Sequence, residues 1–219
     1  MNQIIHVILP EPTLRRLPWY LAFVDTIAGR GIKTVSSTQI SKALNVDASQ
    51  IAKDLSFLNI KGKTRIGYVV AELQEALSGF LDFKTSHKAF LFGAGSLGRA
   101  LMADKGLANF GLNIVAAFDI DPEIIGDEIS GVKIYSMDAL PKLMDEHQAV
   151  IAVLTVPAQK AQDAADAAIE AGMKAIWNFT PYRVAVPDEI VLSSTSMYAN
   201  LALIYNRLNA PSQEQTDCR

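Results

Sequence analysis

The sequence predicts an α/β protein in which a small, mostly helical unit precedes a doubly wound parallel sheet, and a last helix follows the sheet. Up to about residue 85 apolar residues recur three or four apart, whereas from His87 short apolar runs alternate with helical stretches. A final helical segment, 196–208, is apolar on nearly every side. We therefore expect one domain over 1–85, a second over 86–193, a separate helix over 194–209 and a disordered tail over 210–219.

Composition excludes several classes of protein. Half of the 219 residues are hydrophobic, but no stretch reaches the roughly 18 consecutive apolar residues that a membrane span needs. The apolar run Ile4–Leu9 is too short for a secretion signal, so we expect a cytoplasmic protein with no membrane partner. The single cysteine, Cys218, excludes a disulfide framework and a cysteine-based metal site within one chain, and no metal is expected.

Charge is uneven along the chain. Residues 1–85 carry 10 Lys and Arg against 7 Asp and Glu, a net +3, and the remainder carries 10 against 16, a net −6. A mildly basic N-terminal segment on an acidic body is a weak indication of nucleic-acid binding.

The N-terminal unit is expected to open with an amphipathic helix, because apolar residues from Leu14 to Val24 fall three to four apart. Two short helices follow, within 36–44 and 47–55, and they open on the capping residues Ser37 and Asp47. Gln50 lies three residues after Asp47, which is a capping-box spacing. Two short capped helices joined by a brief turn form a helix-turn-helix.

A small basic hairpin is expected next, because Gly62 and Gly67 enclose alternating basic and β-prone residues. A hairpin behind a helix-turn-helix makes a winged helix, and a further helix over 70–81 would complete the domain. The basic residues suit phosphate or minor-groove contacts, although such side chains also solvate ordinary loops. They are Lys61, Lys63 and Arg65.

The second half of the chain has a β-α-β pattern. Six apolar runs, with helical stretches between them, predict a parallel, doubly wound sheet. The expected strands are 88–92, 113–118, 132–135, 149–154, 175–178 and 190–192.

A glycine-rich loop, G-A-G-S-L-G, follows the first of these strands and opens a helix, and Asp119 lies 21 residues beyond Gly98 at the end of the next strand. This is the Rossmann fingerprint for a dinucleotide. Gly93 permits the tight turn, Gly95 allows close approach of the pyrophosphate, and Gly98 allows packing of helix on strand. Asp119, with Asp121 as a competitor, would accept from ribose hydroxyls and repel a 2′-phosphate, which favours NADH and NAD⁺. Alternatively, the glycines only pack a strand on a helix.

No residue suited to acid–base chemistry lies at the expected carboxyl edge of the sheet, so we expect no catalytic residues. His6, His87 and His147 lie elsewhere, and the strands end in T-V-P and N-F-T-P. Lys160 and Tyr182 leave one alternative open, an NAD-dependent oxidoreductase with an appended helical domain. A separate alternative is a nucleotide- or CoA-binding regulatory subunit that meets proteins and not DNA.

The last helical segment, 196–208, is too apolar to rest on one surface and needs burial on all sides. Burial within its own domain is one solution. A partner subunit is the other, and a two-fold dimer suits a reader of palindromic DNA.

The order of these motifs resembles the Rex redox-sensing repressors over about residues 9–208. The shared segments are Leu14–Pro18, Ser36–Ser37, Asp47–Ser56, Gly67–Tyr68, Gly93–Gly98, Ala117–Asp119, Leu154–Pro157 and Asn178–Pro181. The resemblance implies a homodimer with a swapped C-terminal helix. Such a protein binds palindromic operator DNA when NADH is low and releases it when NADH binds.

The resemblance also implies roles for individual residues. The cofactor-binding residues would be Gly93, Ala94, Gly95, Ser96, Leu97, Gly98, Asp119, Ile120, Thr155, Val156, Pro157, Asn178, Phe179 and Thr180. The DNA-binding residues would be Arg16, Ser36, Ser49, Gln50, Lys53, Lys61, Lys63 and Arg65, with 49, 50 and 53 in the major groove. Three single positions depart from the family pattern, namely Ala52, where an arginine or another polar residue is common, Asp104, where a tyrosine is frequent, and Ser196, where an aspartate is often found. The segment 59–63 also differs from the Gly-rich turn that usually precedes the wing.

Overall fold

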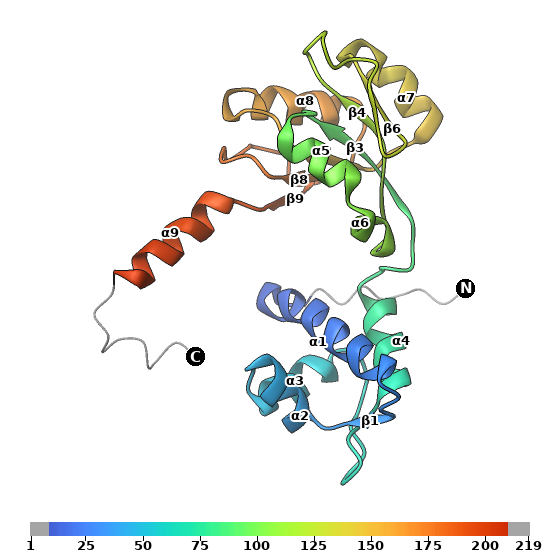
Figure 1. The fold of residues 1–219 in the computed structure, drawn as a ribbon, viewed down its shortest axis with the longest axis vertical. Coiled ribbons are helices and arrows are strands. Elements are labelled where there is room, and N and C mark those ends of the chain that lie inside the picture. Colours follow the sequence, from blue (N-terminus) through green and yellow to red (C-terminus); the bar gives the residue numbers. More distant parts are fainter. Residues whose placement is uncertain (1–8, 210–219) are drawn as a thin grey trace. The chain divides into compact units, whose positions relative to one another are not determined.

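A computed structural model describes residues 9–209, and the chain divides into two compact units between Lys84 and Thr85 (Figure 1). The α/β class is confirmed, with a helical unit before a mostly parallel sheet. The expected disordered tail, 210–219, lies outside the described residues, as do His6 and Cys218. Within the described part no helix is long and apolar enough to cross a bilayer, and no group of three or more His, Cys, Asp or Glu side chains is placed to hold a metal ion.

Four helices and a two-stranded sheet form the first unit. The helices are α1 (Glu11–Gly29), α2 (Ser37–Leu44), α3 (Ala48–Ser56) and α4 (Val70–Phe80), and the strands are β1 (Thr34–Val35) and β2 (Tyr68–Val69). Leu17, Tyr20, Ile40, Ile51 and Leu73 are fully buried and tie the helices into one core. The strands pair antiparallel, so the chain that follows the wing returns to the segment before α2.

The second unit is a seven-stranded sheet in the order β5-β6-β4-β3-β7-β8-β9. Its strands are β3 (His87–Phe92), β4 (Leu112–Phe118), β5 (Glu128–Ile129), β6 (Val132–Tyr135), β7 (Ile151–Leu154), β8 (Ala175–Asn178) and β9 (Val191–Ser194). Every pair is parallel except β5 with β6. Strand β3 pairs with β4 on one side and β7 on the other, so the order reverses there, and ligands bind beyond the strand ends at such a point.

Helices accompany the sheet, and the last of them is exposed along its length among the residues that the structure describes. They are α5 (Ser96–Ala103), α6 (Lys105–Asn109), α7 (Leu140–His147), α8 (Ala161–Glu170) and α9 (Met197–Leu208). Phe90, Phe92 and Phe118 pack together in the core between the sheet and its helices. No residue of α9 is buried, and Ile204 and Leu208 are 50% and 74% exposed. Burial of this helix within its own domain, one of the two sequence-based alternatives, is therefore wrong.

The two residues that depart from the family pattern in the second unit both cap helices. Asp104 accepts a hydrogen bond from the Gly106 amide at the start of α6. Ser196 accepts one from the Ala199 amide at the start of α9. A side-chain oxygen at this position satisfies an amide that has no partner inside the helix, so both residues have a local structural role.

Candidate functional site

A cavity of about 860 Å³ opens beyond the carboxyl ends of the central strands. The described residues that line it come from the ends of β3 and β4, from the glycine loop, from the segments after β4, β6, β7 and β8, and from the first turns of α5, α8 and α9. They are Phe92, Gly93, Gly95, Leu97, Phe118, Asp119, Ile120, Asp121, Ile124, Met137, Thr155, Val156, Pro157, Ala158, Gln159, Lys160, Asp163, Ala164, Phe179, Thr180, Pro181, Met197 and Tyr198. The cavity is mainly apolar, with a few polar groups gathered at the strand ends.

The glycine loop has a separate steric reason for each of its glycines. Gly93 has a φ of +95°, and a Cβ there would lie 2.8 Å from the Thr155 carbonyl carbon. A Cβ on Gly98 would lie 2.1 Å from the Gly93 carbonyl oxygen, so only glycine lets α5 approach the strand. A Cβ on Gly95 would meet nothing within 4 Å. Gly93 and Gly98 are therefore required by packing, whereas Gly95 borders open space in the cavity.

Contacts within the chain hold the loop in place. The Thr155 hydroxyl donates to the Gly93 carbonyl oxygen at 2.6 Å, and the Ala94 amide donates to Asp119 Oδ2 at 2.6 Å. Asp119 Oδ1 accepts from the amides of Ile120 and Asp121 at 2.7 and 3.1 Å. A carboxylate offers about four acceptor directions. Asp119 thus fixes the loop and keeps capacity for one further donor.

Ten of the fourteen cofactor-binding candidates line this cavity, and four do not. Asn178 is fully buried, where it donates to the Tyr182 carbonyl and accepts from the Thr180 amide. Its side chain shapes the turn after β8 and does not border the cavity. The other three, which belong to the loop or to α5, are Ala94, Ser96 and Gly98.

Some lining residues were not among the candidates. Phe92 and Phe118 directly precede the predicted loop and acid, so their place at a strand end was a usable signal. Met197 and Tyr198 belong to α9, which is far away in sequence, and no local pattern indicated them. Lys160 lines the cavity and lies 3.2 Å from Asp163, whereas Tyr182 is not among the lining residues. The two groups proposed for catalysis are therefore not gathered at the cavity.

The helix-turn-helix is capped at both of its helices, with two changes from the predicted details. The N-cap of α2 is Ser36, not Ser37, and it forms a reciprocal capping box with Gln39. Asp47 caps α3 by accepting from the Ser49 and Gln50 amides at 2.7 and 3.3 Å. The capping box expected between Asp47 and the Gln50 side chain is absent, because that amide group bonds Asp54 instead.

The wing is a short hairpin with exposed basic residues. Lys63 and Gly67 exchange two backbone hydrogen bonds of 2.8 Å across a three-residue turn. Gly67 has a φ of +85°, and a Cβ there would lie 2.4 Å from the Val35 carbonyl oxygen, so glycine is required where the wing meets β1. The three basic candidates of the wing are exposed, as is Lys53 on α3.

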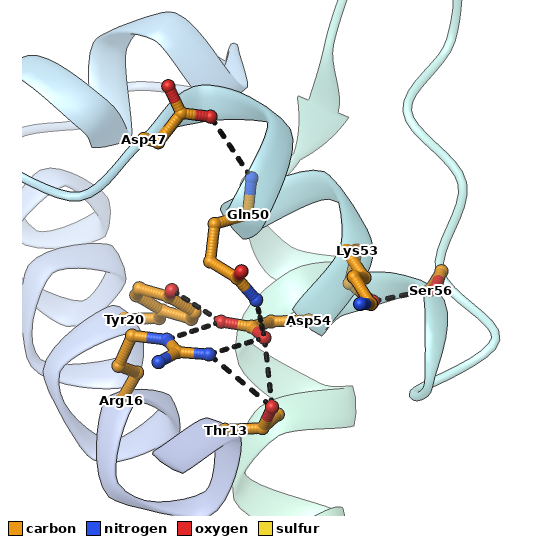
Figure 2. Close-up of polar contacts among 8 residues, drawn as sticks. All are labelled: Thr13, Arg16, Tyr20, Asp47, Gln50, Lys53, Asp54 and Ser56. Atoms are coloured by element: carbon orange, nitrogen blue, oxygen red, sulfur yellow. Dashed lines mark hydrogen bonds and ion pairs between the residues drawn. The ribbon is translucent and has the colours of Figure 1, made fainter. Parts of the chain in front are cut away.

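Arg16 and Gln50 take part in a buried polar cluster around Asp54, whose side chain is 0% exposed (Figure 2). Arg16 donates from Nε to Oδ2 at 2.7 Å and from Nη2 to Oδ1 at 2.8 Å. Tyr20, Thr13 and Gln50 donate to the same carboxylate at 2.7, 3.0 and 2.8 Å. These five residues are called the Asp54 cluster below, and they join α1 to α3.

Charge and burial act against each other in this cluster. Burial alone would raise the pKa of Asp54, but hydrogen bonds from Arg16, Tyr20 and the other donors outweigh it, and the pKa lies below its ordinary value. The hydrogen bond to Asp54 raises the pKa of Arg16. Burial, helped by the hydrogen bond to Asp54, raises the pKa of Tyr20. The cluster therefore holds one ionised carboxylate against one guanidinium at neutral pH.

Two protein-family models match the chain. One is described as a putative DNA-binding protein N-terminus and covers residues 8–56, and the other is described as a CoA binding domain and covers residues 84–182. Curated relatives carry the name redox-sensing transcriptional repressor Rex. One from Bacteroides thetaiotaomicron is 57% identical over 92% of this chain and 91% of its own length. One from Porphyromonas gingivalis is 50% identical over 92% and 93%.

Solved structures of a Rex-family repressor called RSP are also similar. Its complex with β-NAD⁺ and operator DNA matches with a TM-score of 0.88 at 32% identity, over 93% of this chain and 94% of that one. Its complex with β-NADH matches with a TM-score of 0.83 at 32% identity, over 93% and 95%. The relatives are named as repressors, which indicates a regulatory and not a catalytic class.

Proposed function

The chain belongs to the Rex family of redox-sensing transcriptional repressors. From this premise we propose that it binds operator DNA through residues 1–85 and releases it when NADH enters the cavity at the edge of the sheet of residues 86–193. The observation that carries the proposal is that one chain holds both a DNA-binding type of unit and a nucleotide-binding type of cavity. A capped helix-turn-helix with a basic wing precedes a sheet whose glycine loop borders a cavity at its switch point.

The residues of the cavity fit a dinucleotide. A volume of about 860 Å³ lies within the usual range for ligand sites. Gly95 borders open space, which leaves room for a pyrophosphate, and the loop leads into the N-terminus of α5, where amides and the helix dipole favour an anion. We assign the pyrophosphate to residues 93–98 and the nicotinamide side to 155–157 and 179–180.

Asp119 would distinguish NADH from NADPH. Its remaining acceptor direction suits a ribose hydroxyl, and its charge opposes a 2′-phosphate in the same place. Asp121 also lines the cavity, but its Oδ1 already accepts the Glu123 amide at 3.0 Å. We therefore keep Asp119 as the ribose partner.

For DNA we assign the major groove to the exposed residues Ser49 and Lys53 of α3, and the backbone or minor groove to Lys61, Lys63 and Arg65 of the wing. In the α2 cap the Ser36 hydroxyl donates to Gln39 Oε1 and accepts the Gln39 amide, which leaves one lone pair for another contact. Because the relatives are bacterial repressors and bacterial operators lie in the cytoplasm, we also place this chain there.

A homodimer formed through α9 accounts for the exposed apolar surface of the second unit. Strand β9 and α9 expose Val191, Leu201, Leu203, Ile204 and Tyr205 between 41% and 68%. A surface of this kind is typical of a subunit interface. A second copy that contributes the same helix would bury it with two-fold symmetry, which palindromic DNA requires.

Titration of DNA binding with nucleotides tests the proposed function. The probe is a palindromic duplex selected by the wild-type protein from a random library. NADH should release the duplex at concentrations where NAD⁺ and NADPH do not. Release that does not depend on which nucleotide is added would contradict the redox-sensing proposal.

Gly95→Ala is the matched variant for this experiment. The new methyl group enters open space without disturbing the loop, so the variant should fold and bind the duplex like the wild type. It should respond poorly to NADH, since the methyl group occupies space that the pyrophosphate needs. A Gly95→Ala protein with the full NADH response would show that the nucleotide binds elsewhere.

A further inference from the structure

The Asp54 cluster fixes α3 to α1 through one carboxylate. Asp54 follows Lys53 directly in the chain, and it lies one helical turn after Gln50. Thr13, Arg16 and Tyr20 lie three and four residues apart on α1, so they share one face of that helix. Five hydrogen bonds converge on the two carboxylate oxygens, and no buried side-chain nitrogen or oxygen atom of the described residues lacks a partner.

The geometry of this contact is directional. Both guanidinium bonds run to different oxygens of Asp54, which fixes the plane of the carboxylate as well as its distance. The neighbouring contacts of Ile51 and Leu55, both 0% exposed, are apolar and have no preferred direction. Apolar packing keeps α3 on the core, and the Asp54 cluster sets its rotation about its own axis.

Rotation of α3 matters because its outward face is narrow. The exposed residues are Ser49, Ala52, Lys53 and Ser56. The Ser49 and Ser56 hydroxyls donate to Asp47 Oδ1 and to the Lys53 carbonyl oxygen. A rotation by one residue, about 100°, would therefore move Lys53, which carries the amino group of this face, away from the bases.

We propose that the Asp54 cluster is a positioning device for the recognition helix, and that Arg16 and Gln50 act inside it and not on the DNA. Gln50 is half-buried, and its amide group points to Asp54 (Figure 2). Arg16 has a side chain only 20% exposed and uses two nitrogens on the same carboxylate. The inference rests on the proposed function, since it concerns how that DNA contact is oriented.

Three roles give three different signatures. A residue that contacts a phosphate lowers the salt dependence of binding by about one unit when it is removed. A residue that reads a base relaxes selectivity at one base pair. A positioning residue instead lowers affinity for the selected duplex at all base pairs together, while affinity for random DNA and the salt slope stay unchanged.

The experiment compares Arg16→Lys, Tyr20→Phe and Gln50→Ala in the full chain. The controls are Arg15→Lys, an exposed neighbour paired with Glu11, and Tyr68→Phe, a buried tyrosine of the same unit outside the cluster. Fluorescence anisotropy measures each protein on the selected duplex, on single base-pair variants of it and on a random duplex, over a range of salt. Thermal unfolding establishes that each protein is folded at the assay temperature.

We expect Arg16→Lys and Tyr20→Phe to weaken binding to the selected duplex by about tenfold, because each loses a directional bond to a charged group. Binding to the random duplex should change by less than about twofold. Gln50→Ala should weaken binding evenly across base pairs. The controls should bind like the wild type, and a wild type that fails to select any duplex would count against the proposed function and not against the cluster.

The inference is overturned if Arg16→Gln, a further variant that removes the positive charge, lowers the salt slope, or if Gln50→Ala loses discrimination at one base pair. It is also overturned if folded Arg16→Lys and Tyr20→Phe keep the wild-type ratio of selected to random affinity. If Arg16→Lys does not fold, Tyr20→Phe decides, since that change removes one hydroxyl and keeps the ring.

Discussion

At the glycine loop main-chain atoms shape the site, whereas in the first unit side chains of α1 and α3 shape it around Asp54. Gly93 and Gly98 are required because any Cβ would collide with main-chain atoms, and Asp119 holds main-chain amides. Arg16 and Gln50, in contrast, turn inward to Asp54. A site shaped by the backbone can be predicted largely from residue types, such as the glycines. A site shaped by side-chain contacts between helices cannot be predicted in this way.

The largest change in the free energy of unfolding should come from disrupting the Asp54 cluster. Replacing Arg16 with Met leaves Asp54 buried without its cation, and loss of one partner of a buried pair costs about 3–5 kcal/mol. The remaining donors, Tyr20, Thr13 and Gln50, should place the loss near the lower end of that range. Urea unfolding followed by circular dichroism measures it, and a loss like that of Arg15→Met, which removes an exposed pair, would show that the cluster adds no stability.

A smaller loss of stability should follow from adding a methyl group to the packed part of the glycine loop. Gly98→Ala places a methyl group against the Gly93 carbonyl oxygen, and overpacking of this kind costs about 1–3 kcal/mol. Gly95→Ala, whose methyl group meets nothing, should leave stability unchanged. Calorimetric unfolding of the two variants separates the roles. If the Gly98→Ala and Gly95→Ala proteins were equally stable, Gly98 would not be needed for packing.

Acid should lower the stability of the first unit because it protonates Asp54. Its pKa is lowered in the folded chain, so its contribution to stability is present above the unfolded pKa of about 4 and is lost as the pH falls through the folded value. The difference in unfolding free energy between the wild type and Asp54→Asn should therefore narrow from about pH 5 to about pH 3. Parallel pH curves for the two proteins would contradict the depressed pKa.

The smallest effect should be seen in the wing. Lys63 is exposed, and we expect it to neutralise one phosphate without reading a base. Lys63→Ala should lower the salt slope of DNA binding by about one unit and leave stability unchanged. Lys105→Ala, an exposed lysine of the other unit, is the control. A variant that keeps the slope but changes base preference would make the wing a base reader.

The fold was predictable because its signals are local. Apolar runs indicated six of the seven strands of the large sheet, and β5, with two residues, was too short to show a period. Strand β1 was missed for the same reason, since Thr34 and Val35 become a strand only by pairing with residues 68–69. The N-cap of α2 is Ser36 and not the predicted Ser37. Two adjacent serines offer the same hydroxyl group, so the sequence alone does not tell which of them caps the helix.

The sites were predictable to different degrees. Glycines and an acid at fixed spacing indicated the cavity, and ten candidates line it. Asn178 stays a prediction, since the structure shows only that its side chain bonds within the turn after β8. The Asp54 cluster left no local signal, since Thr13 and Asp54 are 41 positions apart and meet only in the folded unit.

The anchoring of the glycine loop also bears on how fast such a sensor responds. The Thr155 hydroxyl and the Asp119 carboxylate hold Gly93 and Ala94 from within the chain. Binding to a site held in this way carries little ordering cost and no slow rearrangement of the loop. Association of the nucleotide would then be limited by its encounter with the cavity and not by the folding of the loop around it.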